Sequence, residues 1–281
     1  MPAAGRADER DLSPYAGLGT WIDIYSPSFR ADADGIAAAL ARHRVRTLYV
    51  ETGNFRQRSD IVAPQQLGRL IEAAHARRIA VVGWYLPDLT NLTRDLRRAL
   101  AALRFVSSGG ERLDSFALDI ESSAVRNVAV RTRRLLTLSM RLRTAVGTGY
   151  ALGAIIPSPV GMRLLPRYWP GFPYAALDRT FDAFLPMTYY TYRAHGSAAV
   201  ARYVQTSVAI IRTQTGDASV PIHVIGGLAD ATSNSDVAAF ARTVGTCGAR
   251  GFSLYDFFET KPAVWSLLSR AASTAPAASS C

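Results

Sequence analysis

The sequence of 281 residues predicts an α/β protein that folds as a single (β/α)₈ barrel, also called a TIM barrel. Strand-like and helix-like segments alternate along the chain, and the pair recurs roughly every thirty to thirty-five residues. An open doubly wound sheet is the alternative, but it usually carries a glycine-rich phosphate turn after its first strand. Here the first expected strand is followed by Tyr25-Ser26-Pro27, so the barrel is favoured.

The first half of the chain shows both periodicities. Residues 20–25 alternate isoleucine with aromatic and acidic residues, which is typical of a strand. Residues 79–86 form a continuous apolar run, as in parallel strands covered on both sides, and residues 64–78 place apolar side chains at helical spacing. In chain order we expect strands at 20–25, 47–51, 79–86 and 115–121, and helices at 34–44, 64–78 and 91–105.

The second half continues the alternation after one interruption. Residues 157–174 hold prolines at 157, 159, 166, 170 and 173 and aromatics at 168, 169, 172 and 174. Disordered segments rarely carry so many aromatics, so we expect an ordered insertion after the fifth strand. The remaining expected strands are 151–156, 181–189, 221–226 and 251–255, with helices at 128–146, 198–215, 236–244 and 262–272.

These elements make one barrel domain over residues 17–272. A polar segment at 1–16 is expected to be a loose arm, and an Ala/Ser/Pro-rich segment at 273–281 a disordered tail. The sequence holds no apolar run long enough to cross a membrane, and its charged start shows no signal peptide. Two cysteines, Cys247 and Cys281, make neither a disulfide framework nor a metal cluster.

The formal charge of +10 raises the question of nucleic-acid binding. Lys261 is the sole lysine, and the arginines are scattered through helical segments. Exposed helix faces explain this distribution better than a binding patch does. We therefore expect no nucleic-acid partner.

The candidate site lies at the C-terminal ends of the strands, where barrel enzymes keep their active sites. At the end of the fourth strand, Asp119 and Glu121 share one face of the strand, because side chains alternate between faces. Two carboxylates at the exit of a buried strand need strong partners or a function. The other strand ends add the candidate second carboxylates Asp23, Glu51 and Asp256 and the candidate substrate-binding residues Tyr25, Trp84, Tyr85, Tyr189, Tyr190, Asp230 and Tyr255.

Carboxylates beside aromatic rings suit a carbohydrate. Acids hydrogen-bond sugar hydroxyls, aromatic rings cover the C–H faces, and glycosidic cleavage needs an acid and a second carboxylate. The four histidines show no metal-ligand spacing, so we expect neither a metal nor another cofactor. A weaker alternative is a lyase or isomerase that holds a phosphate ligand on Gly226-Gly227, although Asp230 close by would repel it.

The segment 114–121 resembles the Asp-Gly-x-Asp-x-Asp-x-Glu signature of chitinase-type glycoside hydrolases of family eighteen, which it matches at Asp114, Asp119 and Glu121. Residues 187–190 are similar to that family's Met-x-Tyr-Asp. The resemblance implies that Glu121 is the proton donor, that Asp119 orients it, and that Tyr189 lines the site. The chain departs from the family at Ser115, Ala117, Tyr190 and Tyr255.

Nearly the whole chain resembles uncharacterised glycoside-hydrolase-like barrels of actinobacteria. The shared motifs are Gly-Thr-Trp-Ile-Asp-Ile at 19–24, Tyr-Trp-Pro-Gly-Phe-Pro at 168–173 and Ser-Leu-Tyr-Asp at 253–256. We therefore expect a glycoside hydrolase that acts on a polysaccharide or cell-envelope glycan, with Glu121 as general acid. The missing carboxylates at 117 and 190 keep open a barrel that binds glycans without cleaving them. A glycan substrate suggests export, whereas the start of the chain leaves a cytoplasmic location open.

Overall fold

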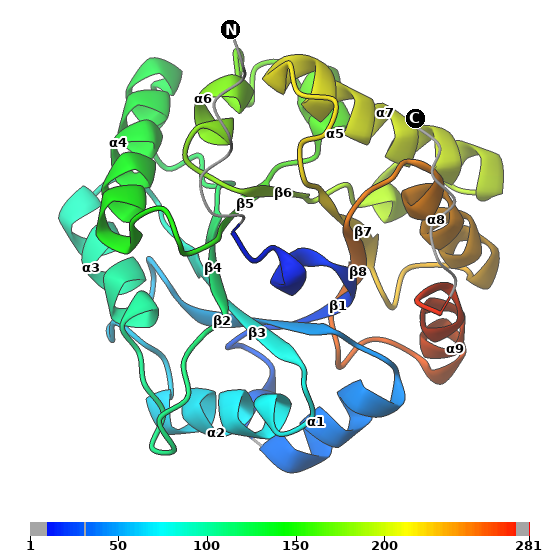
Figure 1. The fold of residues 1–281 in the computed structure, drawn as a ribbon. Coiled ribbons are helices and arrows are strands. Elements are labelled where there is room, and N and C mark those ends of the chain that lie inside the picture. Colours follow the sequence, from blue (N-terminus) through cyan, green and yellow to red (C-terminus); the bar gives the residue numbers. More distant parts are fainter. Residues whose placement is uncertain (1–9, 31, 274–280) are drawn as a thin grey trace, which may run out of the picture.

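The computed structural model describes residues 10–30, 32–273 and 281, and it confirms the (β/α)₈ barrel (Figure 1). Eight parallel strands form one sheet in the order β6-β5-β4-β3-β2-β1-β8-β7. Backbone bridges from Phe184 to Ile222 and from Met187 to Ile225 bring β6 beside β7 and close the ring. The strands are β1 (Gly17–Ile22), β2 (Thr47–Asn54), β3 (Ala80–Leu86), β4 (Ser115–Asp119), β5 (Leu152–Ile156), β6 (Ala183–Pro186), β7 (His223–Leu228) and β8 (Gly251–Tyr255).

Helices surround the strands on the outside, and side-chain caps fix where several of them begin (Figure 1). The side chains of Asn91, Asn127 and Ser233 accept backbone N–H groups of the first turns of α3, α4 and α8. Within the described residues, none of the helices is long and apolar enough to span a membrane. The helices are α1 (Ala33–Arg42), α2 (Pro64–His75), α3 (Leu92–Leu103), α4 (Val128–Val146), α5 (Pro159–Leu164), α6 (Tyr174–Asp178), α7 (Ser197–Thr215), α8 (Asn234–Thr246) and α9 (Pro262–Ala271).

The expectation of a loose arm is wrong for its last residues, because the short helix Ser13–Tyr15 enters the barrel (Figure 1). Tyr15 is fully buried, and its hydroxyl lies 2.6 Å from Ser115 Oγ. Gly153 and Gly251 make room for it, since an added Cβ would lie 2.8 Å from the Tyr15 hydroxyl or 2.5 Å from its carbonyl oxygen. Residues 1–9 of the expected arm lie outside the described residues.

A polar network continues from Tyr15 across the barrel interior at its N-terminal end, where the strands begin. His223 Nδ1 lies 3.1 Å from both the Tyr15 carbonyl oxygen and the Tyr49 hydroxyl, and its Nε2 lies 3.0 Å from Ser253 Oγ. Trp21 Nε1 donates to the same Ser253 hydroxyl at 2.8 Å. Burial lowers the pKa of His223 to about 4, so this imidazole stays neutral and structural.

The insertion after β5 is ordered, as the sequence predicts, and contains α5 and α6. Trp169 anchors it to α4, where its Nε1 donates to Thr132 Oγ1 at 3.0 Å. The guanidinium of the buried Arg131 lies over the Trp169 ring, 4.1 Å from its centroid, and donates to the carbonyl oxygen of Tyr168. These contacts fix the segment that carries Tyr168 toward β4.

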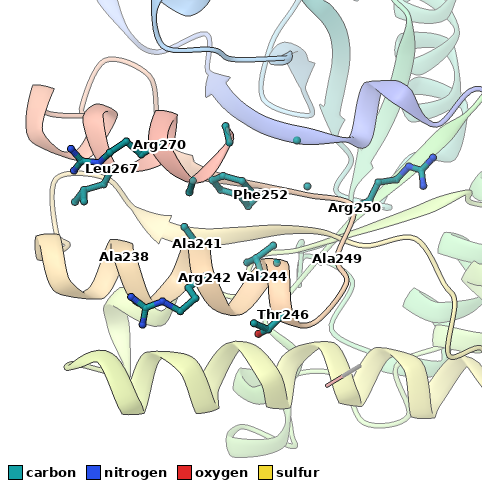
Figure 2. A pocket seen from close by; sticks show the side chains of 15 residues that line it. Ala238, Ala241, Arg242, Val244, Thr246, Ala249, Arg250, Phe252, Leu267 and Arg270 are labelled. Carbon is teal, nitrogen blue, oxygen red and sulfur yellow. The ribbon is translucent and has the colours of Figure 1, made fainter. Parts of the chain in front are cut away.

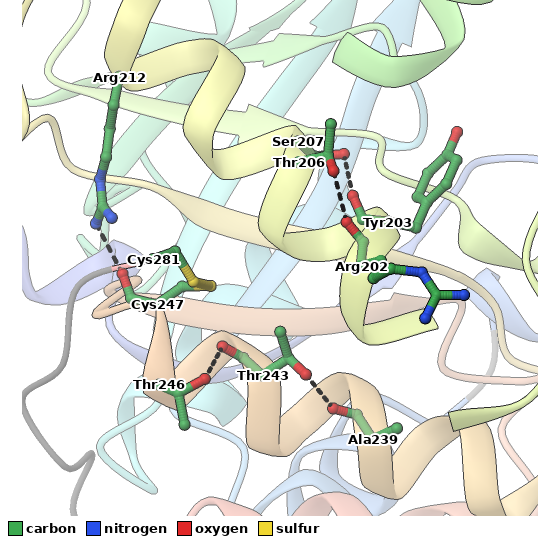
Figure 3. The surroundings of a disulfide bond; sticks show 10 residues. All are labelled: Arg202, Tyr203, Thr206, Ser207, Arg212, Ala239, Thr243, Thr246, Cys247 and Cys281. Atoms are coloured by element: carbon green, nitrogen blue, oxygen red, sulfur yellow. Dashed lines mark hydrogen bonds between the residues drawn. A yellow bond between two sulfur atoms is a disulfide. The ribbon is translucent and has the colours of Figure 1, made fainter. Parts of the chain in front are cut away.

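A disulfide joins Cys247, at the C-terminal end of α8, to Cys281 (Figure 3). Nothing in the sequence pattern indicated a bond between these two cysteines, which stand 34 residues apart. Arg212 of α7 donates to the carbonyl oxygen of Cys247 at 2.8 Å, so the cross-link lies where α7 and α8 pack. Residues 274–280, most of the expected disordered tail, lie outside the described residues.

Candidate active site

Asp119 is the last residue of β4, at the mouth of the barrel, by which we mean the C-terminal strand ends and the loops that follow them. It shares the inward face of the strand with Ala117, and its side chain is only 7% exposed. Its Oδ1 has no hydrogen-bond partner among the described residues. Burial raises the pKa of Asp119 well above its ordinary value, and the negative charges of Glu121 and Glu51 raise it further.

Glu51 extends from β2 into the same part of the barrel and is 2% exposed. Its Oε2 accepts the backbone N–H of Ile24 at 3.1 Å, and its Oε1 accepts Asn54 Nδ2 at 2.8 Å. Burial raises the pKa of Glu51 to about 7 against these two hydrogen bonds, and the charge of Asp23 adds to the rise. Near neutral pH this carboxyl therefore exchanges its proton readily.

Glu121 lies just past the end of β4, on the rim of the mouth, and remains in contact with solvent. Enough protein surrounds the carboxyl that desolvation raises its pKa. Tyr168, from the insertion, donates to the backbone carbonyl oxygen of Glu121. Burial and then the charge of Glu121 raise the pKa of Tyr168 to about 12, and the hydrogen bond keeps the Tyr168 hydroxyl beside the backbone of the candidate acid.

Asp23 and Asp256 occupy the β1 and β8 side of the mouth. Asp23 Oδ1 accepts the backbone N–H groups of Tyr25 and Ser26 at 2.8 and 3.0 Å, and its Oδ2 accepts the hydroxyl of Tyr255 at 2.5 Å. Asp256 is 6% exposed. Burial raises the pKa of Asp256, and the charge of Asp23 contributes.

Tyr189 connects the two groups of acids. Its pKa is raised well above the ordinary value, first by burial and then by the charges of Asp119, Glu121 and Asp256, among others. The Tyr189 hydroxyl thus interacts electrostatically with Asp119 and Glu121 at the end of β4 and with Asp256, which follows β8. We refer to Asp23, Glu51, Asp119, Glu121 and Asp256 together as the mouth acids.

Trp84 forms part of the floor beneath these acids. It faces inward from β3, packs edge-on against Trp21 with ring centroids 6.1 Å apart, and is 6% exposed. Its Nε1 has no partner among the described residues. Tyr25 lies at the rim instead, with its side chain 60% exposed and its hydroxyl accepting Asn54 Nδ2 at 2.6 Å.

Two expected substrate-binding residues face away from the mouth, which corrects the expectation from the sequence. Tyr85 points outward from β3, and its hydroxyl donates to the buried Asp95 of α3 at 2.9 Å. Tyr190 packs against Phe240 of α8 with ring centroids 5.5 Å apart. Tyr85 follows the inward Trp84 by one position, so alternation along β3 places it in the outer core. Tyr190 begins the short helix Tyr190–Tyr192 after β6, and this turn directs its side chain to the outer core. Asp230 is exposed on the loop after β7, where its carbonyl oxygen accepts Lys261 Nζ at 3.3 Å.

Sequence reasoning missed Asn54 and Tyr192. Asn54 bridges Glu51 and Tyr25, a role made possible by an irregularity in β2 between Glu51 and Gly53. Tyr192 is 64% exposed, and its ring lies 5.9 Å from that of Tyr189. The position of Asn54, three residues after an inward Glu at a strand end, could have indicated its role. Nothing in the sequence indicates the position of Tyr192 at the site.

One cavity of the molecule is far from these acids. It measures about 560 Å³ and lies between α8, α9 and the start of β8 (Figure 2). Its lining includes Gly17 and Gly251, the first residues of β1 and β8, so it belongs to the opposite end of the barrel. In barrel enzymes that end serves stability, and we place the candidate site at the mouth.

Neither family models nor curated protein sequences give a match to this chain. Similar solved structures include a chitinase from Chromobacterium violaceum, with 13% identity and a TM-score of 0.63 over 92% of this chain and 99% of that chain. The spore cortex-lytic enzyme of Bacillus cereus has 11% identity and a TM-score of 0.64 over 90% and 73%. The endo-1,4-β-mannanase of Rhizomucor miehei has 10% identity and a TM-score of 0.67 over 94% and 96%. The chain therefore has the fold of chitinases and related glycoside hydrolases.

Proposed function

We propose that the protein is a glycoside hydrolase that cleaves a polysaccharide or cell-envelope glycan by carboxylate acid/base catalysis at the barrel mouth. The observation that carries the proposal is the environment of Asp119. A buried carboxyl with a free oxygen lies within the electrostatic influence of Glu121, just past the end of the same strand, and of Glu51 on β2. Carboxyls whose pKa values are raised by burial and by each other are the groups that glycosidic cleavage needs.

In this proposal Glu121 is the general acid. It reaches solvent at the rim, and its raised pKa keeps a proton available for the leaving oxygen. Asp119 is the second carboxylate, because its Oδ1 is not engaged. Glu51 acts on Asp119 through its charge and not as a nucleophile or base, since both of its oxygens accept hydrogen bonds and its side chain is almost fully buried.

Asp23 and Asp256 fit a supporting role better than that of a nucleophile or base. Both oxygens of Asp23 are occupied, one by two backbone N–H groups and the other by the Tyr255 hydroxyl. Asp256 Oδ1 accepts the backbone N–H of Glu259 at 3.0 Å. We assign them to shaping the mouth.

The test is the release of reducing ends from a panel of glycans by the full-length protein and by Glu121→Gln. Loss of the general acid is expected to lower the rate about 100- to 10,000-fold. Glu111→Gln is the matched control, because Glu111 is exposed and contacts His75 at the other end of the barrel. If Glu121→Gln releases the same products at the wild-type rate from every substrate, the assignment fails.

A glycan-binding barrel without catalysis is the second candidate. Ala117 is completely buried on the inward face where the family-eighteen signature has a carboxylate, and Tyr190 faces the outer core. The exposed rings of Tyr25 and Tyr192 would then hold a sugar. Binding to a glycan array without any product release would favour this candidate over the hydrolase.

Packing accounts for Gly226-Gly227 without a phosphate ligand. A Cβ on Gly226 would lie 2.7 Å from the Phe240 ring, and one on Gly227 would lie 2.5 Å from Thr191 Oγ1. The backbone N–H that follows them, of Leu228, already donates to Thr191 Oγ1 at 3.2 Å. Nothing in this geometry favours the phosphate alternative.

A further inference from the structure

Among the residues that the structure describes, the mouth acids have no cationic partner. In the described parts of the chain, no nitrogen of Lys, Arg or His lies within 4.0 Å of a carboxylate oxygen of these five residues. Other acids do pair with arginine, namely Asp60 and Asp88 on the loops after β2 and β3, and Asp182 just before β6. The chain has 32 basic residues and 22 acidic residues. A shortage of basic residues therefore does not explain why the mouth acids lack ion pairs.

The acids also repel one another. The charges of Glu121 and Glu51 act on Asp119, and the charge of Asp23 acts on both Glu51 and Asp256. Among the described residues, no group of three or more His, Cys, Asp or Glu side chains is arranged to hold a metal ion. The charge is therefore left for protons or for an organic cation to neutralise.

Asp119 Oδ1 indicates where such a cation would bind. Asp119 is more than nine-tenths buried, this oxygen has no donor among the described residues, and the side chain is on the inward face of β4. A buried acceptor without a donor is costly, and a charged N–H donor compensates for it best. The exposed rings of Tyr25 and Tyr192 offer faces to the C–H side of a sugar ring and to a cation.

We infer that the glycan taken by this site is built from amino sugars whose nitrogen is not acetylated, so that a protonated amine of the sugar binds among the mouth acids and donates to Asp119. This inference rests on the proposed function for its claim that the ligand is a glycan. It adds the substrate class, which neither the fold nor the resemblance to chitinases supplies. An N-acetylated sugar is neutral at that nitrogen and provides no cation for the mouth acids.

The experiment compares glucosamine oligomers and galactosamine oligomers with their fully N-acetylated counterparts of equal length. Binding to the full-length protein is measured by calorimetry at about 20 and about 200 mM salt, and reducing-end release is measured in parallel. We expect at least one amino oligomer to bind about 10- to 100-fold more tightly than its acetylated counterpart, and salt to weaken that binding. Since the whole protein has a net charge of +10, non-specific attraction cannot produce this preference.

Asp119→Asn is expected to abolish the preference, while Glu111→Gln, at the opposite end of the barrel, preserves it. If Asp119→Asn fails to fold, as judged by circular dichroism, the wild-type comparison still decides. Equal or tighter binding of the acetylated oligomers overturns the inference. Hydrolysis of acetylated glycans alone would support the proposed hydrolase and refute the amino-sugar class, whereas amino-oligomer binding without hydrolysis would do the reverse. Absence of binding to any oligomer overturns the inference.

Discussion

Replacing Glu51 with glutamine is expected to stabilise the protein in base and destabilise it in acid. In the unfolded chain the carboxyl titrates near 4.5, whereas burial in the native barrel raises its pKa to about 7. Below pH 4.5 the carboxyl is protonated in both the native and the unfolded state, so its burial does not lower the unfolding free energy. Between pH 4.5 and 7 the unfolded chain releases the proton that the native state keeps, so native stability falls as the pH rises. Above pH 7 the carboxyl is ionised in both states, and the full loss of unfolding free energy caused by its burial is present.

The structure gives the size of the effect. Raising this pKa from 4.5 to about 7 corresponds to about 3 kcal/mol, since a tenfold change in proton affinity is worth about 1.4 kcal/mol. A neutral amide avoids that cost. Its single oxygen can accept from Ile24 N–H or from Asn54 Nδ2 but not from both, which costs about 1 kcal/mol at every pH. Glu51→Gln is therefore about 1 kcal/mol less stable than wild type at pH 4 and about 2 kcal/mol more stable at pH 8.

Urea unfolding of both proteins at pH 4, 5, 6, 7 and 8 measures this difference in unfolding free energy. The two curves should cross between pH 5 and 7. A difference that stays constant across the range would refute the reasoning, because it would mean that burial does not perturb Glu51. The same substitution removes a negative charge that acts on Asp119, so the acidic limb of any hydrolytic pH profile should move to lower pH.

Three further expectations follow from other parts of the molecule. Cys281→Ser, which opens the 34-residue cross-link, should lower the unfolding free energy by about 4 kcal/mol in urea, and a reductant should do the same to the wild type. Tyr15→Phe removes the buried hydroxyl beside Ser115 and should cost about 1–2 kcal/mol in the same assay without changing glycan binding. Tyr189→Phe should weaken glycan binding about tenfold, whereas Tyr190→Phe should bind as the wild type does, since that side chain packs on α8.

The fold could be predicted because each repeat carries its own periodicity. Phe116, Leu118 and Ile120 lie in the outer core, while Ala117 and Asp119 face inward, as strict alternation requires. Element ends were less predictable. β1 ends at Ile22, because Asp23 caps the following turn with its side chain, and this leaves Tyr25 on a loop. Such a turn depends on one side chain, which periodicity does not register.

The candidate site was predictable to the level of strand ends, and the errors have a common cause. Trp84 with Tyr85, and Tyr189 with Tyr190, are neighbouring aromatics of which one faces the mouth and one faces the helices. Where two aromatics adjoin, the sequence does not say which of them is inward. Tyr15 shows a different limit, since its burial depends on contacts with residues about a hundred positions away.

Two buried polar atoms without partners support the placement of the site at the mouth, although the N-terminal end of the barrel interior also has one among the described residues, Thr47 Oγ1 at the start of β2. At the N-terminal end, His223 makes hydrogen bonds with the Tyr15 carbonyl oxygen and with the Ser253 hydroxyl, and Trp21 donates to the Ser253 hydroxyl as well. At the mouth, Asp119 Oδ1 and Trp84 Nε1 have no partner in the described structure. One is an acceptor with raised proton affinity and the other a donor, and a sugar with both an amine and hydroxyls can satisfy the two together. A neutral apolar ligand could satisfy neither, so weak binding of amino sugars and strong binding of apolar compounds would contradict the assignment of this end as the functional one.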